Sequence, residues 1–230
     1  MVTRLLKGVY NQRPPMPRYS TTWDVGVVTK HIAAMGGNES LSLKQLSQKL
    51  VVLMALVAAS RTSELKALDI RFRTYKPDGV LFRLASLTKK RSPGLPPRKL
   101  FFGAFPEDRR LCVVECLRRY ERETAEFRQP ESREKPLFLS YVHPHKPVTS
   151  QRLAHWVKDL LVEAGVDQSF KAHSVRGAST SAAMARGVSL ADILSTADWS
   201  KESTSRCFYY RATKTTEYVA KVLQGGTPTQ

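Results

Sequence analysis

Cysteine and long apolar runs are both scarce in this chain of 230 residues. Its 3 cysteines are too few for a disulfide framework, and its first residues, M-V-T-R-L-L-K, have neither the long apolar stretch nor the small-residue cleavage site of a signal peptide. The longest apolar run, from Leu50 to Ala59, is about half of what a membrane span needs. The sequence therefore predicts an intracellular protein of a reducing compartment, with no membrane partner.

Acidic residues are also in short supply. The chain has 20 Asp and Glu against 37 Lys and Arg, a formal net charge of +17 at pH 7. A chain this basic predicts a polyanion as partner. A membrane surface is the rival polyanion, but no basic amphipathic helix stands out, so nucleic acid is favoured. The 42% of apolar residues suffices for a soluble globular protein, either one domain with an appendage or two small domains.

The first twenty residues contain the proline-rich stretch R-P-P-M-P-R-Y. Three prolines in four positions forbid a helix and favour an extended connector. After this stretch, Thr22 is predicted to cap a short helix that runs through Met35 and stops at Gly36 and Gly37. Residues 1–38 are therefore interpreted as a connector with a short helix.

A buried helix is predicted next. Ser42-x-x-Gln45 is a capping box, and the residues after it are apolar on nearly every side of a helix through Val57. Arg61 and Glu64 follow at its polar end, one turn apart. They form either an ion pair on a surface helix that continues, or a site at which a rigid buried helix delivers Arg61 to a phosphate while Glu64 orients its neighbours.

Residues 80–102 change to the period of strands. They are predicted to form two strands around a turn at residues 92–94, and the tip carries Lys89, Lys90 and Arg91. These three side chains form either a solvated hairpin tip or a contact to nucleic acid.

The middle of the chain is predicted to hold a helix over residues 109–128, a short buried strand at 136–140, and a helix from Thr149 or Ser150 to Gly165. Arg152 and Lys158 on the last helix are predicted phosphate contacts. Two cysteines and two histidines raise the question of zinc, but their spacings fit no common zinc motif, and no metal site is predicted (Cys112, Cys116, His143, His145).

The most informative stretch runs from His173 to Arg211. It contains H-S-V-R, a helix rich in Ala and Ser, a helix capped by Ser189, the indole of Trp199 and the adjacent phenols Tyr209 and Tyr210. An Arg grips two phosphate oxygens with its planar fork, His and Trp nitrogens donate to the same anion, and a phenol is a covalent nucleophile. This combination is typical of phosphoryl transfer through a protein hydroxyl.

The order and spacing of these groups resemble the tyrosine recombinase (phage-integrase) family. The resemblance rests on Arg61-x-x-Glu64-Leu65, a Lys in a later hairpin, His173-x-x-Arg176, Trp199 and a following Tyr, over residues 40–225. With F-Y-Y-R after W-S-x-x-S-T, it is closest to recombinases of eukaryotic DIRS-type retroelements. A nuclear location in a eukaryote follows from it.

The resemblance implies a mainly α fold with a small antiparallel sheet. Residues 1–38 are then the remnant of a connector from an N-terminal DNA-clamping domain, and 39–230 are the catalytic domain with a C-terminal tail helix. The implied partners are double-stranded DNA and further copies of the chain in a synaptic oligomer on DNA. No metal or other cofactor is implied.

The resemblance also implies a role for each group. Arg61, His173, Arg176 and Trp199 hold the non-bridging oxygens, Glu64 belongs to the same set, and a Tyr attacks to give a 3′-phosphotyrosyl intermediate. Lys89, or Lys90 one residue on, protonates the leaving 5′ oxygen. The alternatives are a catalytically inactive DNA-binding module and a type IB topoisomerase, which shares the chemistry.

Two adjacent phenols compete for the role of nucleophile. Neighbours on a helix diverge by about 100°, so only one of them can face a given phosphate. If the helix begins at Ser203 or Thr204, Phe208 lies on its apolar side. Tyr209 then falls at the edge of that side, where packing holds the ring while the hydroxyl reaches DNA, and Tyr210 points to solvent. We predict Tyr209 as the nucleophile, with Tyr210 as the alternative.

Overall fold

The computed structural model of the chain describes residues 8, 12, 19–84, 98–128 and 131–199. Several of the predicted features lie outside the described residues: the hairpin tip with its turn, the last capped helix, both phenols and the tail helix (Lys89, Lys90, Arg91, residues 92–94, Ser203, Thr204, Tyr209, Tyr210, residues 213–224).

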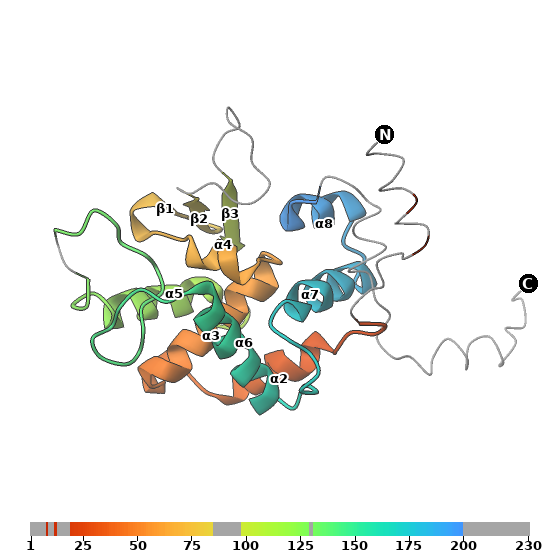
Figure 1. Cartoon of the computed structure of the whole chain (residues 1–230), viewed down its shortest axis with the longest axis horizontal. Coiled ribbons are helices and arrows are strands. Elements are labelled where there is room, and N and C mark those ends of the chain that lie inside the picture. The colour runs from red at the N-terminus through yellow and green to blue at the C-terminus, as the bar shows by residue number, and fades with distance from the viewer. Residues whose placement is uncertain (1–7, 9–11, 13–18, 85–97, 129–130, 200–230) are drawn as a thin grey trace, which may run out of the picture.

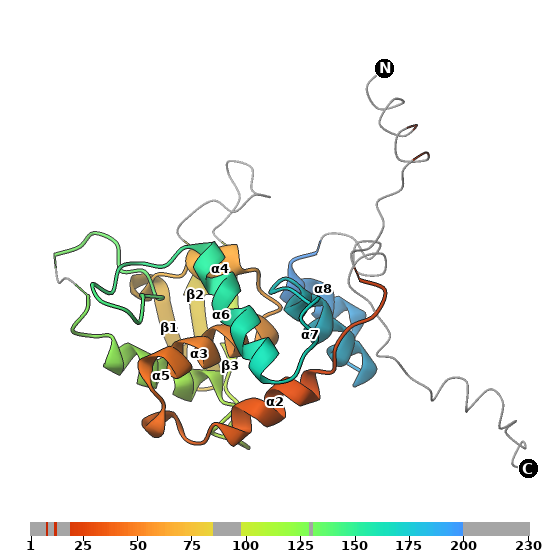
Figure 2. The same ribbon diagram turned by 60° about the horizontal axis from the view of Figure 1, so that its bottom comes forward.

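Helix α3, Leu43–Val57, is the centre of the fold (Figures 1 and 2). The predicted capping box is confirmed: the Ser42 hydroxyl accepts from the backbone of Gln45, whose side chain accepts from the Ser42 backbone. Every residue from Leu46 to Leu56 is buried. The helices that pack against it most extensively are α5 (Val113–Glu123), α6 (Ser150–Glu163) and α7 (Ser174–Ala185).

The short helix near the N-terminus is α2, Val25–Ala34. Its cap is Asp24 and not the predicted Thr22, because the Asp24 carboxylate accepts from the backbone N–H of Gly26. The helix ends before Gly36, whose positive φ of 86° suits glycine, and a 3₁₀ turn, Asn38–Ser40, leads to α3. Its Val28 and Ile32 belong to the same apolar core as α3.

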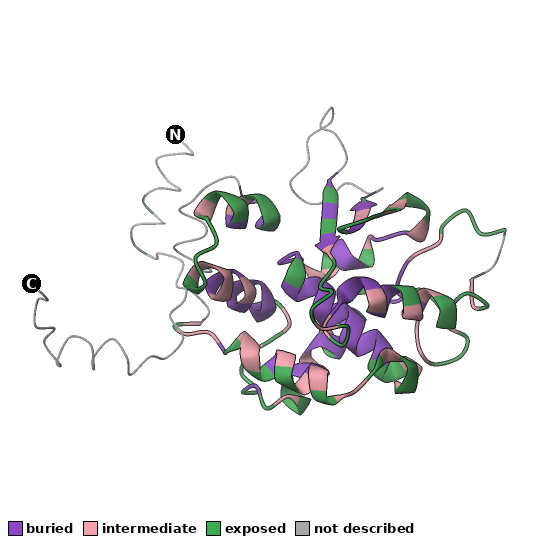
Figure 3. Ribbon diagram, turned by 180° about the vertical axis from the view of Figure 1, so that it is seen from behind, coloured by how far each residue is buried: buried purple, intermediate pink, exposed green. Residues whose placement is uncertain are grey.

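A three-stranded antiparallel sheet covers another side of α3. Its order is β1 (Arg73–Lys76), β2 (Gly79–Arg83) and β3 (Lys99–Gly103). The two strands predicted within 80–102 are confirmed, whereas β1 was not predicted. The buried face carries Val80, Phe82, Leu100 and Phe102 (Figure 3).

Two predicted elements differ from the structure. The helix expected over 109–128 is limited to α5, because Asp108 folds back to accept from the backbone and side chain of Arg110 in a turn. The strand expected at 136–140 is reduced to two isolated bridges, Asp69 with Pro136 and Leu139 with Pro147. Proline has no N–H to give to a ladder, so pairing cannot extend there.

Helices α7 and α8 (Leu190–Ala197) form the C-terminal part of the described chain. Ser189 caps α8 as predicted, its hydroxyl accepting from the backbone of Asp192. This part has its own small apolar cluster of Ala59, Ile193, Ala197 and Trp199 beside the main core. The fold is therefore mainly α with a small antiparallel sheet, as predicted. None of the helices in the described part combines the length and the apolar character that crossing a bilayer requires.

Candidate functional site

Arg61 lies in a break between two helices. Helix α3 ends at Val57, Ala59 takes a positive φ of 43°, and Arg61 is the N-cap of α4, Thr62–Lys66. The predicted i,i+3 ion pair is present, but the continuing surface helix is wrong: the chain turns here, and Glu64 is only 2% exposed.

The Glu64 carboxylate is the hub of the site. It accepts from the backbone N–H of Arg61 at 2.8 Å and from the Nη1 of the same residue at 2.9 Å. Because the Arg61 side chain is 37% exposed, it is the guanidinium here that an incoming ligand can reach. A buried carboxylate thus orients an accessible cation.

A second arginine, which the sequence did not single out, reaches the same carboxylate. Nη1 of Arg98 donates to Oε1 of Glu64 and lies 3.4 Å from Oδ2 of Asp198. The Arg98 side chain is only 6% exposed. In the sequence, Arg98 follows two prolines in a basic run, and no local pattern distinguishes it from the exposed Lys99 that comes next.

Arg176 is the third arginine of the site, on the first turn of α7, and it is buried. Its Nη1 donates to the carbonyl of Ala59 at 2.8 Å, its Nη2 donates to the carbonyl of Ala197, and Nη1 is 4.0 Å from Oε2 of Glu64. Both carbonyls lie at helix C-terminal ends, where the helix dipole favours a cation. Arg176 therefore ties α3, α7 and α8 together.

Trp199 follows α8 directly. Asp198 is in the left-handed conformation, with φ 52° and ψ 51°, and the backbone N–H of Trp199 donates to the carbonyl of Leu194 at 2.9 Å. This C-cap turns the chain so that the indole is buried and its ring centre lies 4.8 Å from Cζ of Arg176.

His173 is the N-cap of α7, one turn before Arg176, and it is exposed. Its ring stacks on that of Tyr19, with 5.4 Å between centroids and 27° between planes. The Tyr19 hydroxyl is itself fixed, since it accepts from the backbone of Lys171 at 3.1 Å. Next to it, the indole N–H of Trp23 donates to Ser174 at 2.9 Å. Residues read as connector thus support the start of α7.

The structure brings four of the predicted residues, Arg61, Glu64, Arg176 and Trp199, into one contact network, which we call the Glu64 network. Arg98 and Asp198 complete it, and His173 lies at the end of the same helix as Arg176. The network holds three guanidinium groups against two carboxylates, so its net charge is positive. Such a site suits an anion with several oxygens.

The two predicted contacts on α6 do not share a face. Arg152 is exposed and Lys158 is half-buried, six residues on, which places them about 120° apart around the helix axis. Thr149 is the cap of this helix, because its hydroxyl accepts from the backbone of Arg152.

The residues weighed for zinc have other surroundings. Cys112 and Cys116 are buried, and burial raises the pKa of Cys116 to about 12, so its thiol is neutral. His145 stacks on Phe127 with 3.8 Å between ring centroids. Within the described ranges, no three His, Cys, Asp or Glu side chains are grouped so as to hold a metal ion.

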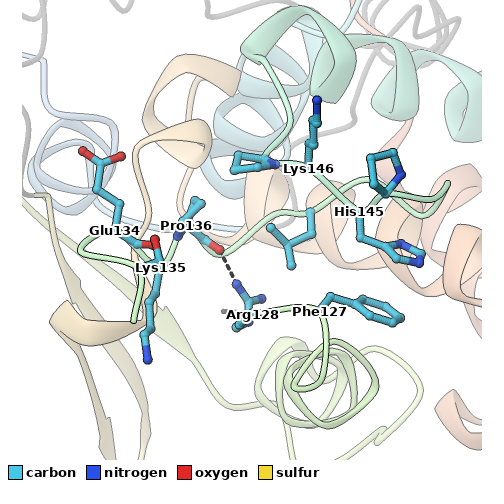
Figure 4. Close-up of a pocket in the computed structure, with 11 residues that line it drawn as sticks. Phe127, Arg128, Glu134, Lys135, Pro136, His145 and Lys146 are labelled. Atoms are coloured by element: carbon cyan, nitrogen blue, oxygen red, sulfur yellow. Dashed lines mark hydrogen bonds between the residues drawn. The ribbon is translucent and has the colours of Figure 1, made fainter. Parts of the chain in front are cut away.

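Figure 4 shows a separate pocket at the end of α5, lined by Phe127, His145 and Lys146 among others. Arg128 closes its floor by donating to the backbone carbonyls of Pro136 and Leu137. None of its lining residues belongs to the Glu64 network. The Arg128 guanidinium is therefore a support for the 136–147 segment.

Neither a scan against protein-family models nor a search of curated proteins finds a match. Solved structures do match. The XerH site-specific recombinase bound to palindromic difH substrate, in a post-cleavage complex, has a TM-score of 0.65 and 15% sequence identity, over 90% of this chain and 54% of that one. The fold is that of the tyrosine recombinases.

Two further tyrosine recombinase structures agree with this assignment of the fold. The XerA recombinase has a TM-score of 0.63 at 16% identity, over 95% of this chain and 69% of that one. The Tn1549 transposon integrase in complex with transposon right end DNA has a TM-score of 0.58 at 12% identity, over 92% and 67%. The chain thus spans about half the length of XerH and about two thirds of the other two.

Proposed function

We propose that the protein is a site-specific DNA recombinase or integrase of a mobile element, closest in its motifs to DIRS-type retroelement recombinases. The observation that carries the proposal is the Glu64 network, in which a buried carboxylate organises three arginines and an indole on a tyrosine recombinase fold. Its net positive charge matches the extra negative charge of a phosphorus centre under attack.

The proposed reaction needs neither metal nor nucleotide. The Tyr209 hydroxyl releases its proton to solvent as its oxygen attacks the scissile phosphorus, the bond from phosphorus to the 5′ oxygen breaks, and Lys89 gives its proton to that oxygen. The 3′-phosphotyrosyl bond keeps the energy of the broken bond, so a 5′ hydroxyl of another strand can reverse the step and release the enzyme. Lys90 is the alternative to Lys89 as the proton donor, and Tyr210 is the alternative to Tyr209 as the nucleophile.

The groups of the Glu64 network stabilise the transition state in this scheme. Arg61 binds a non-bridging oxygen through its exposed guanidinium, while His173 and Trp199 donate from the ends of α7 and α8. Arg176 lies against the indole, where it contributes positive charge, and its hydrogen bonds hold α3, α7 and α8 together. Preorganised charge of this kind costs no rearrangement during the reaction.

Double-stranded DNA is the proposed partner, with self-association into a synaptic oligomer on it. The net charge of +17 supports the first part, as do the DNA-bound XerH and Tn1549 integrase structures. Lys90, Arg91, Arg152 and Lys158 are proposed backbone contacts. Each phosphate contact lowers the logarithm of the binding constant by about 0.9 per decade of salt, so affinity should fall steeply as salt rises. The division into a connector, 1–38, and a catalytic domain, 39–230, belongs to the same proposal.

The test is covalent capture on a suicide duplex, in which a nick next to the cleavage site lets the cut fragment diffuse away. Wild type should leave an adduct resistant to SDS, in EDTA as in its absence, because the arginines replace a metal. Tyr209→Phe should bind DNA normally and give no adduct, whereas Tyr210→Phe should keep it. Salt-dependent binding without any adduct would instead support the inactive DNA-binding module, and loss of cleavage in EDTA would contradict the mechanism.

A further inference from the structure

Arg98 joins three parts of the chain that are distant in sequence. Its backbone carbonyl accepts from the N–H of Leu84 at 2.8 Å, so it extends the β2–β3 ladder by one pair. Its Nη1 contacts Glu64 in the first turn of α4 and Asp198 at the C-cap of α8. A buried cation therefore lies where the sheet meets two helices.

The two cations on Glu64 differ in their exposure. Arg61 is 37% exposed and Arg98 only 6%, although both donate to Oε1 of the carboxylate. A buried carboxylate that loses its partner is strongly destabilised. If Arg61 turns toward a phosphate, Glu64 still keeps the charge of Arg98. Because Arg98 keeps Glu64 paired, the exposed Arg61 is available for a ligand.

Asp198 links Arg98 to the indole of Trp199, because it pairs with the first and directly precedes the second. It is the left-handed C-cap of α8, and the next residue is Trp199, which lies against Arg176. Although the Asp198 side chain is 52% exposed, its ion pair with Arg98 connects it to the end of the sheet. Asn tolerates the left-handed conformation as Asp does, which makes Asp198→Asn a change of charge alone.

We propose that Arg98 is a positioning residue, which holds Glu64 and Asp198 together and so fixes Arg61 on one side and Trp199 on the other. This inference rests on the proposed function of the Glu64 network. Arg98 itself is too deeply buried to touch DNA. Its removal should slow the chemistry and leave DNA binding unchanged.

The first arm of the test measures single-turnover adduct formation on the suicide duplex, together with DNA affinity. Arg98→Gln should slow adduct formation by about 100-fold at unchanged affinity, since a misplacement of about 1 Å has that effect. Arg98→Lys should recover part of the rate, because it keeps a charge for Glu64 but loses the planar fork. Arg98→Gln combined with Asp198→Asn should be no slower than Arg98→Gln alone.

Arg109→Gln is the matched control, because Arg109 is 82% exposed and pairs with Glu115, outside the Glu64 network. It should form adduct at the wild-type rate. An Arg98→Gln rate equal to that of wild type, or a double variant whose two losses simply multiply, would overturn the proposal.

The second arm needs no DNA and follows the accessibility of Trp199 to acrylamide. The signal is the difference between each protein and its Trp199→Phe counterpart. Arg98→Gln and Asp198→Asn should both raise the quenching of Trp199, and Arg109→Gln should not. If wild type forms no adduct, the proposed function fails, and this arm alone decides whether Arg98 positions the indole. If Arg98→Gln does not fold, Arg98→Lys and Asp198→Asn take its place in both arms; unchanged rates and unchanged quenching would contradict the proposal.

Discussion

The Glu64 network joins two regions that are held in different ways. Arg61 and Glu64 belong to the cap and first turn of α4, and Arg98 directly precedes β3; both elements pack on the large apolar core around α3. Arg176 stands on α7, whose Val175 and Ala178 also belong to this core, whereas Trp199 follows α8, beside a small cluster of four buried residues. Apolar burial holds the first region and one face of α7, whereas α8 depends on the small cluster and on polar ties.

The ties of the second region come from the site itself. The Arg176 guanidinium donates to the carbonyls of Ala59 and Ala197, and Asp198 pairs with Arg98. Regions with few buried apolar contacts open at lower free energy than the core. The groups proposed to stabilise the transition state therefore also hold α8 in place, so chemistry and local stability should change together there and separately at Arg61.

The largest effect should come from the two arginines. Arg61→Ala and Arg176→Ala should each slow adduct formation by roughly 100- to 1,000-fold, the usual result of removing one preorganised donor. Arg176→Ala should also lower the free energy of unfolding by about 3 kcal/mol, because two buried carbonyls lose a charged donor. Arg61→Ala should change it by less than about 1 kcal/mol, since its side chain is partly exposed. Urea denaturation and adduct assays measure both quantities; equal losses of stability would remove the distinction between the regions.

Core substitutions should separate global from local stability. Leu50→Ala in α3 should lower the free energy of unfolding by about 2 to 5 kcal/mol, because the site is fully buried in the main core. Ile193→Ala in α8 should instead speed amide hydrogen exchange within Leu190–Ala197 and leave the denaturation midpoint nearly unchanged. A global loss of similar size from both variants would show that α8 unfolds only with the core.

The ring of Tyr19 offers a smaller effect at His173. Tyr19→Ala removes the stacked partner of the imidazole, a contact of about 0.5 to 1.5 kcal/mol, so adduct formation should fall by about 3- to 10-fold. Tyr19→Phe keeps the ring and removes the hydroxyl, which contacts Ser169 and Lys171. It should react faster than Tyr19→Ala; the opposite order would mean that the hydroxyl, not the ring, supports the site.

The smallest effects are expected from the two helix caps. Ser42→Ala and Ser189→Ala each remove one hydroxyl that accepts from a backbone N–H at a helix N-terminus. Each should lower the stability of its helix by about 1 kcal/mol. The loss at Ser42 should appear in the global free energy of unfolding. The loss at Ser189 should appear as faster hydrogen exchange in α8 alone. Equal midpoints for the two variants would count against separate stabilities.

Local patterns in the sequence predicted much of this fold. The capping box at Ser42 and the cap at Ser189 each depend on four consecutive residues, and the structure has the full box at Ser42 and the hydroxyl cap at Ser189. The resemblance was informative only because the order and spacing of five sites agreed: Arg61-x-x-Glu64, the hairpin Lys, His173-x-x-Arg176, Trp199 and the following Tyr. The roles of these residues stay predictions, as do the choices between Lys89 and Lys90 and between Tyr209 and Tyr210.

What the sequence could not predict depends on distant contacts. Arg98 pairs with Glu64 across 34 positions of the sequence, and no local pattern marks it as buried. Strand β1 was missed because its four residues alternate only between half-buried and exposed. The helix predicted from Arg109 began too early because its period continues through a turn that Asp108 closes.

The hydrogen bond between Leu84 and Arg98 has a consequence for how such a protein can diverge. It closes the ladder just before residues 85–97, so the place of Arg98 is set by the sheet and not by the length of that segment. A change in the length of that segment can therefore leave the cation beside Glu64 in place, and its effect on the proposed chemistry would come through Lys89 or Lys90 instead.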